Sequence, residues 1–222
     1  MYLYDNQIEV IENLDFATSL QHLQLSNNYI KEFPDLQLPH LAKLYMDDNE
    51  LTYIAGLDNC LKLEELHISN QRIPTFTSVS FDQNTLMALS RSLQVLNVSG
   101  NGINSLEQFL CLTNLRKFFC SANAVTDLKE IEMIVGLYRL AEASFIGNPC
   151  CSNRRYRDTV MAASSDSLRI LDDVPVQRHQ QIAVRGLMAH RRKLIPAYPF
   201  EEGDLQLPFE EGVSLEYEGG DM

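Results

Sequence analysis

The stretch LQHLQLSNNYIKEFPDLQLPHLAKLYMDDNEL, residues 20–51, contains one spaced pattern twice. The pattern is L-x-x-L-x-L-x-x-N-x-I, in which apolar residues stand at fixed intervals around an asparagine. Its two copies occupy Leu20, Leu23, Leu25, Asn28 and Ile30, and then Leu41, Leu44, Met46, Asn49 and Leu51. A repeat of this kind predicts one structural unit built several times over.

The pattern extends in both directions from this stretch, with a partial copy before it and four further copies after it. The asparagine position is filled in turn by Asn6, Asn28, Asn49, Gln71, Asn101, Asn123 and Asn148. Successive members are 22, 21, 22, 30, 22 and 25 residues apart. These spacings are close to the period of leucine-rich repeats, so the sequence predicts a solenoid of that type.

The L-x-L centre of each copy predicts a short strand whose apolar residues point inward and whose neighbours point outward. The predicted fold is therefore an α/β leucine-rich-repeat solenoid with a curved parallel sheet on its concave face, short helices or irregular turns on its convex face, and a C-terminal cap. Two further apolar columns are expected to line the convex side of the core. They are Ile11, Phe33, Ile54, Phe76, Leu106 and Leu128, and Leu14, Leu36, Leu57, Val79, Phe109 and Ile131.

Residues 1–150 form the predicted array of seven repeats, of which the first is incomplete and one carries an insertion at 74–92. In that insertion Asp82 or Asn84 is expected to cap a short helix. We expect Gln71, which interrupts the asparagine column, to adjoin an irregular loop. Because Met1 falls inside the first repeat, we expect an incomplete gene model, a fragment, or an edge that a partner covers.

Three segments follow the array. Residues 151–176 are expected to cap it, covering the last core layer with Tyr156, Val160, Leu168, Ile170 and Leu171. Residues 177–193 predict a helix whose apolar positions are Ile182, Leu187 and Met188. The composition of residues 194–222, acidic with Gly and Pro, predicts a flexible tail, although its apolar residues leave open a short docking motif.

Composition and charge exclude several classes of function. The formal net charge is -12, and the acids at 201–221 account for eight negative charges without a Lys or Arg among residues 194–222. This balance argues against binding nucleic acid or an anionic membrane. No apolar run approaches a membrane span, and the N-terminus lacks a secretory signal, so a cytoplasmic or nuclear location is expected. The five cysteines lack metal-finger spacing and are expected to be reduced core thiols.

No catalytic, metal or cofactor residues are predicted. The sequence lacks a G-x-S-x-G motif, a phosphate-binding loop and a metal-ligand cluster, and His22 and His67 have no nucleophile in frame. We interpret the asparagine column as structural, because its side chains can hydrogen-bond to loop backbone groups that would otherwise be buried without partners. An acidic histone- or RNA-associated function is a weaker alternative, since the acids of the tail are interrupted rather than continuous.

The predicted partner-binding residues lie on the concave face, at positions six, four and two residues before each asparagine. They are Gln24, Lys43, Tyr45, Asp47, Glu65, His67, Asn97, Lys117 and Phe119. Solvent-facing aromatic side chains are typical of interaction hot spots, and here they would share one face.

Several segments resemble a known family. The repeat frame is similar to the Sds22-like class of leucine-rich-repeat phosphatase regulators. The narrower resemblance, to the protein phosphatase 1 regulatory subunit 42 family of testis and ciliary proteins, is carried by YLYDNQI (2–8), NLDFATSLQHL (13–23), HISNQRIP (67–74), FDQNTLMALSRSLQVLNVSGNGI (81–103) and NPCCSNRRYRDTV (148–160).

This resemblance implies a non-enzymatic regulatory or scaffolding subunit that associates with the protein phosphatase 1 catalytic subunit and with centrosomal or microtubule structures. It implies a cytoplasmic location at the cytoskeleton, centrosome or cilium. The alternative is a phosphatase-independent ciliary adaptor that binds tubulin or a dynein chain.

Overall fold

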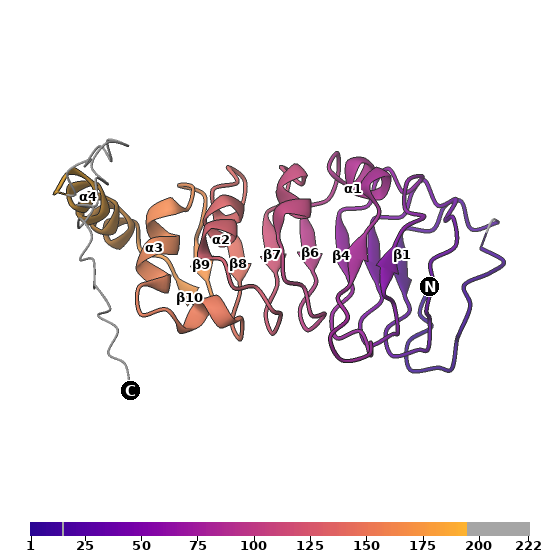
Figure 1. Cartoon of the computed structure of the whole chain (residues 1–222). Coiled ribbons are helices and arrows are strands. Elements are labelled where there is room, and N and C mark those ends of the chain that lie inside the picture. Colours follow the sequence, from indigo (N-terminus) through magenta and orange to yellow (C-terminus); the bar gives the residue numbers. More distant parts are fainter. Residues whose placement is uncertain (15, 195–222) are drawn as a thin grey trace, which may run out of the picture.

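The computed structural model describes residues 1–14 and 16–194 of the chain. The predicted acidic tail lies outside these residues, except for Leu194 at the end of the last helix. Figure 1 shows a row of short strands that runs the length of the molecule, with helices on one side of it.

Within the described residues the main sheet has eight strands in the order β1-β2-β4-β6-β7-β8-β9-β10, and only β9 and β10 pair in the antiparallel sense. Its strands are β1 (His22–Gln24), β2 (Lys43–Tyr45), β4 (Glu65–His67), β6 (Val95–Asn97), β7 (Lys117–Phe119), β8 (Glu142–Ser144), β9 (Ile170–Leu171) and β10 (Val174–Pro175). The partial first copy joins this sheet through a parallel bridge between Tyr2 and Gln24. The strands from β1 to β8 each overlap the L-x-L centre of a repeat, as the sequence predicts, whereas β9 and β10 lie in the segment that follows the array.

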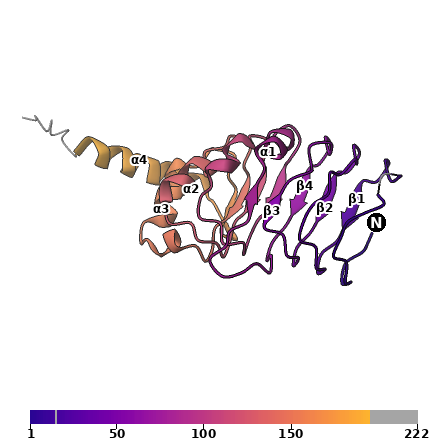
Figure 2. The same ribbon diagram turned by 45° about the vertical axis from the view of Figure 1, so that its right-hand side comes forward.

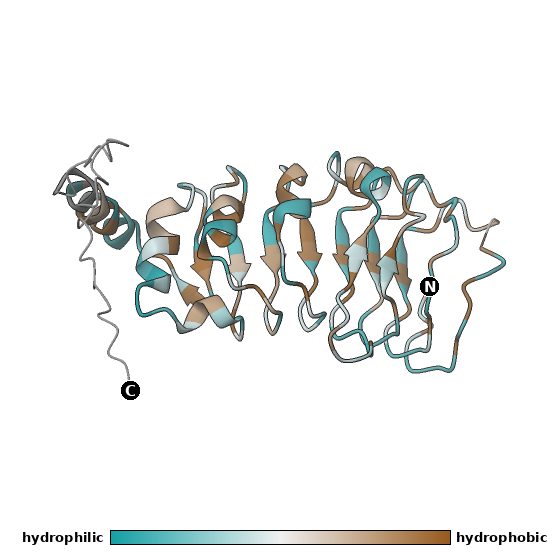
Figure 3. Ribbon diagram, viewed as in Figure 1, coloured by the Kyte–Doolittle hydropathy of each residue, from teal (hydrophilic) through white to brown (hydrophobic). Residues whose placement is uncertain are grey.

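The register of the sheet places the central residue of each strand next to the central residue of its neighbours. The aligned residues from β1 to β8 are Leu23, Leu44, Leu66, Leu96, Phe118 and Ala143, and all are fully buried. Figure 3 shows hydrophobic colour recurring in the strands along the array. The core is therefore a continuous stack in which every repeat buries its apolar residues against the next.

The asparagine column lies inside this stack and bonds to backbone. The Asn49 side chain accepts a hydrogen bond from the Ile30 amide at 3.1 Å and donates to the carbonyls of Leu25 and Met46 at 3.0 and 2.9 Å. Asn6 is exposed and donates to the carbonyls of Leu3 and Tyr4 within its own turn. Each buried asparagine thus joins its own turn to the preceding repeat.

Gln71 takes the place of an asparagine and makes equivalent bonds. Its Oε1 accepts from the Leu51 amide at 2.9 Å, and its Nε2 donates to the Met46 carbonyl at 2.9 Å. The loop after it is irregular, as predicted, because Asn101 accepts from the Gln71 amide while the Ile73 amide turns back to the Gln71 carbonyl.

The residue before each member of the asparagine column has a positive φ. These residues are Asp5, Asn27, Asp48, Asn70, Gly100, Ala122 and Gly147, with φ between 52° and 82°. Asn, Asp and Gly tolerate this left-handed conformation better than other residues do. The turn that aims each asparagine into the core is therefore set by a residue that the repeat frame leaves unspecified.

The side opposite the sheet changes character along the array. Figure 2 shows loops behind β1 and β2 and helices behind the later strands. The elements on this side are β3 (Tyr53–Ile54), β5 (Ser80–Phe81), α1 (Gln83–Leu89), the 3-10 helix η1 (Glu107–Cys111) and α2 (Leu128–Val135). Asp82 caps α1, as predicted, by accepting from the Thr85 amide at 2.9 Å.

One predicted convex core position is wrong. Phe76 is 102% exposed and has a φ of 68°, whereas Val79, three residues later, is buried. The turn that begins at Pro74, whose carbonyl accepts from the Thr77 amide, directs the Phe76 ring away from the core.

The C-terminal cap consists of the 3-10 helix η2 (Pro149–Ser152), helix α3 (Tyr156–Ala163), and strands β9 and β10. Tyr156, Val160, Leu168 and Leu171 are buried as predicted, and Ile170 is half-buried. The Tyr156 hydroxyl donates to the Asp172 carboxylate at 2.8 Å, which joins α3 to the loop after β9.

Helix α4 (Arg178–Leu194) agrees with the predicted helix at 177–193, but its apolar positions do not form a packed face. Ile182 and Leu187 are 59% and 63% exposed. Met188 is half-buried, and Val184 packs against the core. The helix also contacts the cap through Gln181, whose Nε2 donates to the Ser164 hydroxyl at 2.8 Å, and through Arg185. Polar and apolar contacts together thus set the orientation of α4.

All five cysteines are free thiols, but they are not all core residues as predicted. Cys60, Cys120 and Cys150 are buried, whereas Cys151 is half-buried and Cys111 is exposed. Burial raises the pKa of the Cys60 thiol to about 11 and that of Cys120 to about 12.

We expect Leu96→Ala to destabilise the array by about 2 to 5 kcal/mol, because it opens a cavity in the middle of the stack. Met87→Ala, at a 59% exposed position of α1, should change the free energy of unfolding by less than about 0.5 kcal/mol. Urea unfolding followed by circular dichroism compares the two. Equal effects would contradict the assigned core.

We expect Asn49→Ala to cost about 1 to 3 kcal/mol, because three backbone groups lose their buried partner. Asn6→Ala is the matched control at the exposed end of the same column, and its unfolding midpoint should stay close to that of the natural chain. A larger effect at Asn6 than at Asn49 would show that the column does not stabilise the interior.

Candidate protein-binding face

The predicted partner-binding residues lie where the frame places them, on the outer side of the main sheet, which we call the concave face. The register also sets the last residues of neighbouring strands side by side. From β1 to β7 this row is Gln24, Tyr45, His67, Asn97 and Phe119, and every member is partly exposed. The strands therefore bring together side chains that are up to 95 residues apart in the sequence.

Tyr45 and His67 form the most ordered pair on this face. Their rings stack with centroids 4.7 Å apart and an interplanar angle of 25°. Glu65 lies beside them on β4, where its carboxylate accepts from Lys43 Nζ at 2.7 Å and from the Tyr45 hydroxyl at 3.0 Å. Four side chains on two adjacent strands thus hold one another in place.

This cluster has perturbed acid–base properties. Burial alone would raise the pKa of Glu65, but the hydrogen bonds from Lys43 and Tyr45 bring it below its usual value. Burial raises the pKa of Tyr45, and its bond to Glu65 raises it further. Burial lowers the pKa of His67, and the charges of Asp47 and Glu65 only partly oppose that effect. Near neutral pH the cluster presents a neutral imidazole and a neutral phenol beside an ion pair.

Three of the remaining predicted residues already bond to neighbours, whereas Phe119 presents an apolar ring. Asp47 accepts from the Ser69 amide and hydroxyl at 2.7 and 2.6 Å, and Asn97 accepts from the Ser99 amide at 3.1 Å. Lys117 pairs with Glu142 at 2.7 Å. Phe119, half-buried on β7, presents an apolar surface two strands from His67.

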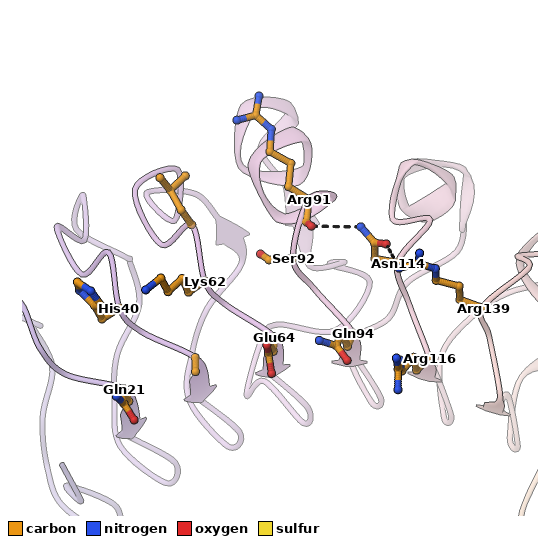
Figure 4. Close-up of a pocket in the computed structure, with 12 residues that line it drawn as sticks. Gln21, His40, Lys62, Glu64, Arg91, Ser92, Gln94, Asn114, Arg116 and Arg139 are labelled. Carbon is orange, nitrogen blue, oxygen red and sulfur yellow. Dashed lines mark hydrogen bonds between the residues drawn. The ribbon is translucent and has the colours of Figure 1, made fainter.

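The sequence analysis missed a groove that borders the concave face. It has a volume of about 500 Å³ and is lined by Lys62, Arg91, Arg116 and Arg139, among others. Figure 4 shows these residues at the ends of successive repeats, between the strands and the opposite side. The sequence contains a signal for this groove, because each of these basic residues stands within two positions of the first leucine of its repeat.

Among the described residues no three His, Cys, Asp or Glu side chains are grouped as metal ligands would be. Every helix within 1–14 and 16–194 is too short or too polar to cross a bilayer.

Comparisons with known proteins agree with this geometry. A family model described as Leucine Rich Repeat matches residues 19–41. The structure is similar to the internalin inlF of Listeria monocytogenes, with 25% sequence identity and a TM-score of 0.61. That match covers 79% of this chain and 47% of the internalin chain, so this chain spans about half of the internalin's length.

Two more solved structures are similar at lower scores. The SNF/U2A′ complex of Drosophila melanogaster matches with 19% identity and a TM-score of 0.48, covering 81% of this chain and 94% of that one. The ectodomain of the receptor kinase SOBIR1 of Arabidopsis thaliana matches with 27% identity and a TM-score of 0.38, covering 50% of this chain and 58% of that one.

The family match and the similarity to internalin confirm the predicted leucine-rich-repeat α/β fold, with a long, mostly parallel sheet and helices on the opposite face. A fold of this type is generally a protein–protein interaction module and is typically non-catalytic.

We expect the pKa of His67 to lie below 6.5, because burial disfavours its charged form. The unfolded chain then binds this proton more readily, so His67 makes folding less favourable as the pH falls below 6.5. Glu65→Gln should lower the pKa of His67 further, and Lys43→Met should raise it. Titration of the imidazole by NMR measures all three values, and opposite shifts would contradict the geometry of the cluster.

Proposed function

We propose that this leucine-rich-repeat protein is a regulatory or scaffolding module that binds a protein partner on its concave face. The observation that carries the proposal is the Tyr45–His67 stack, fixed by Glu65 and Lys43 on adjacent strands. Side chains that are ordered before binding lose less conformational entropy when a partner arrives. Tyrosine is also enriched among interface residues that contribute most to affinity.

A partner seated on the cluster would find both polar and apolar contacts. The half-buried Phe119 lies two strands away from His67, and the strands of a sheet are about 4.8 Å apart. The row from Tyr45 to Phe119 is therefore about 15 Å long, which is the scale of the central patch of an ordinary protein interface. The flanking Lys43–Glu65 and Lys117–Glu142 pairs would form its polar rim.

The partner that we propose is the catalytic subunit of protein phosphatase 1. Support comes from the resemblance of the segments at 67–74 and 81–103 to phosphatase-associated leucine-rich-repeat proteins. The first of these segments begins at His67 itself, and the second contains β6 of the concave face. The same resemblance supports a location at the centrosome, cilium or microtubules.

The test is the affinity of the full chain for purified phosphatase catalytic subunit, measured by calorimetry. We expect Tyr45→Ala/Phe119→Ala to weaken binding about tenfold or more, which corresponds to losing at least about 1.4 kcal/mol of contact energy. The matched control is Phe16→Ala/Met87→Ala, which removes side chains that are 79% and 59% exposed outside the concave face.

An equal loss in both double variants would refute the assignment of the concave face. If the intact chain does not bind the phosphatase but sediments with microtubules, the phosphatase proposal fails and the cytoskeletal adaptor replaces it. Retention of that sedimentation by Phe16→Ala/Met87→Ala and its loss in Tyr45→Ala/Phe119→Ala would still place the partner on the concave face.

A further inference from the structure

The groove beside the concave face gathers positive charge on a chain that is otherwise acidic. Its charged lining residues are Lys62, Arg91, Arg116 and Arg139, against a single acid, Glu64, which gives a net charge of +3. The complete chain has a net charge of -12. We call this surface the basic groove.

The four cations come from four successive repeats. Each precedes, by one to four residues, a strand of the main sheet: β4, β6, β7 and β8 in turn. Because neighbouring strands are about 4.8 Å apart, the groove runs across the N-terminal ends of these four strands for about 15 Å. In Figure 4, Lys62 and Arg139 lie on opposite sides of the groove with Arg116 nearer the strands, and the Arg91 side chain points up along the helix above them.

The groove is held in position by polar contacts. Arg139 Nη1 donates to Asn114 Oδ1 at 2.7 Å. The same amide group donates through Nδ2 to the carbonyls of Ser90 and Arg91 at 2.9 and 3.2 Å. One asparagine therefore fixes Arg139 relative to the loop that carries Arg91, and three repeats are joined across the groove.

Among the described residues, the groove's cations form no ion pair with an acid. Within the described part of the chain, the ion pairs within 4.0 Å involve Lys31, Lys43, Lys117 and Arg185, and none involves a cation of the basic groove. The hydroxyl of Ser92, which also lines the groove, is the one buried side-chain oxygen or nitrogen among the described residues that has no hydrogen-bond partner. Repeated like charges without counter-charges favour an anionic occupant.

We propose that the acidic C-terminal segment of this chain, residues 201–221, binds in the basic groove. The segment carries eight acids and no base. These acids are Glu201, Glu202, Asp204, Glu210, Glu211, Glu216, Glu218 and Asp221. Between the acids at 201–204 and 210–211 lie Leu205, Leu207 and Phe209, and the lining of the groove includes Leu61, an apolar side chain that is 56% exposed.

Covalent attachment favours this occupant over a separate acidic peptide. The 28 residues that follow Leu194 can span up to about 90 Å when extended. Helix α4, from which they start, is packed on α3 next to the last repeats of the array. A tethered segment has an effective concentration in the millimolar range, enough for a weak ionic contact to be populated. The site is independent of the proposed function, because it uses none of the partner-binding residues of the concave face.

The test is zero-length carbodiimide cross-linking of the full chain, with the linked residues identified by mass spectrometry. We expect carboxylates of 201–221 to join Lys62 about tenfold more often than Lys31 or Lys129, which are exposed elsewhere. At 1 M NaCl, where charges are screened beyond about 3 Å, the preference should disappear. A mixture of isotope-labelled and unlabelled chains should give links within one chain only.

Three variants separate binding from folding. Arg91→Glu/Arg116→Glu/Arg139→Glu should abolish the preference for Lys62, whereas Arg154→Glu/Arg155→Glu/Arg178→Glu should keep it. Glu201→Gln/Glu202→Gln/Glu210→Gln/Glu211→Gln changes no described residue, and the remaining acids of the segment should then lose their preference. Links shared equally among Lys31, Lys62 and Lys129, or links between two chains, would overturn the proposal.

Discussion

The structure depends on one constraint, which is that each repeat completes the interior of its neighbour. An isolated L-x-L strand would leave its leucine and its turn carbonyls exposed, and only the next repeat covers both. Asn49 illustrates this, since its side chain bonds to the Leu25 carbonyl of the preceding repeat and to the Met46 carbonyl of its own. The consequence is a fixed parallel register from β1 to β9, in which no repeat can slip without breaking buried hydrogen bonds.

That register determines which side chains can act together on the surface. Tyr45, Glu65 and His67 meet because residues four or six positions before consecutive column members lie side by side. The same register places Arg116 and Arg139 next to each other at the N-terminal ends of β7 and β8. The array therefore presents two adjoining surfaces of different chemistry: an ordered polar and aromatic row on the concave face, and a line of cations beside it. Because the register sets both surfaces, a change within one repeat alters their composition without moving the other repeats.

The sequence predicts the features that follow from the repeat pattern. It does not predict side-chain directions that depend on local turns or on contacts between elements. It predicted the strands, the inward leucines, the cap of α1 by Asp82 and the extent of α4. It failed at Phe76, because a turn beginning at Pro74 directs that ring outward. The sequence did not show which side of α4 is covered: Ile182 and Leu187 are exposed, because the helix meets the rest of the protein through Gln181, Val184 and Arg185. The sequence pattern did not predict the basic groove, because its cations stand outside the strand positions whose side chains are expected to point outward.

Hydroxyl-radical footprinting of the chain, alone and with the partner proposed above, the phosphatase catalytic subunit, tests the central claim most directly, because it reports the solvent exposure of individual side chains. The account predicts that binding protects Tyr45, His67 and Phe119 and leaves Phe16 and Met87 as reactive as in the free chain. Protection of Phe16 or Met87, with Tyr45, His67 and Phe119 still reactive, would contradict it.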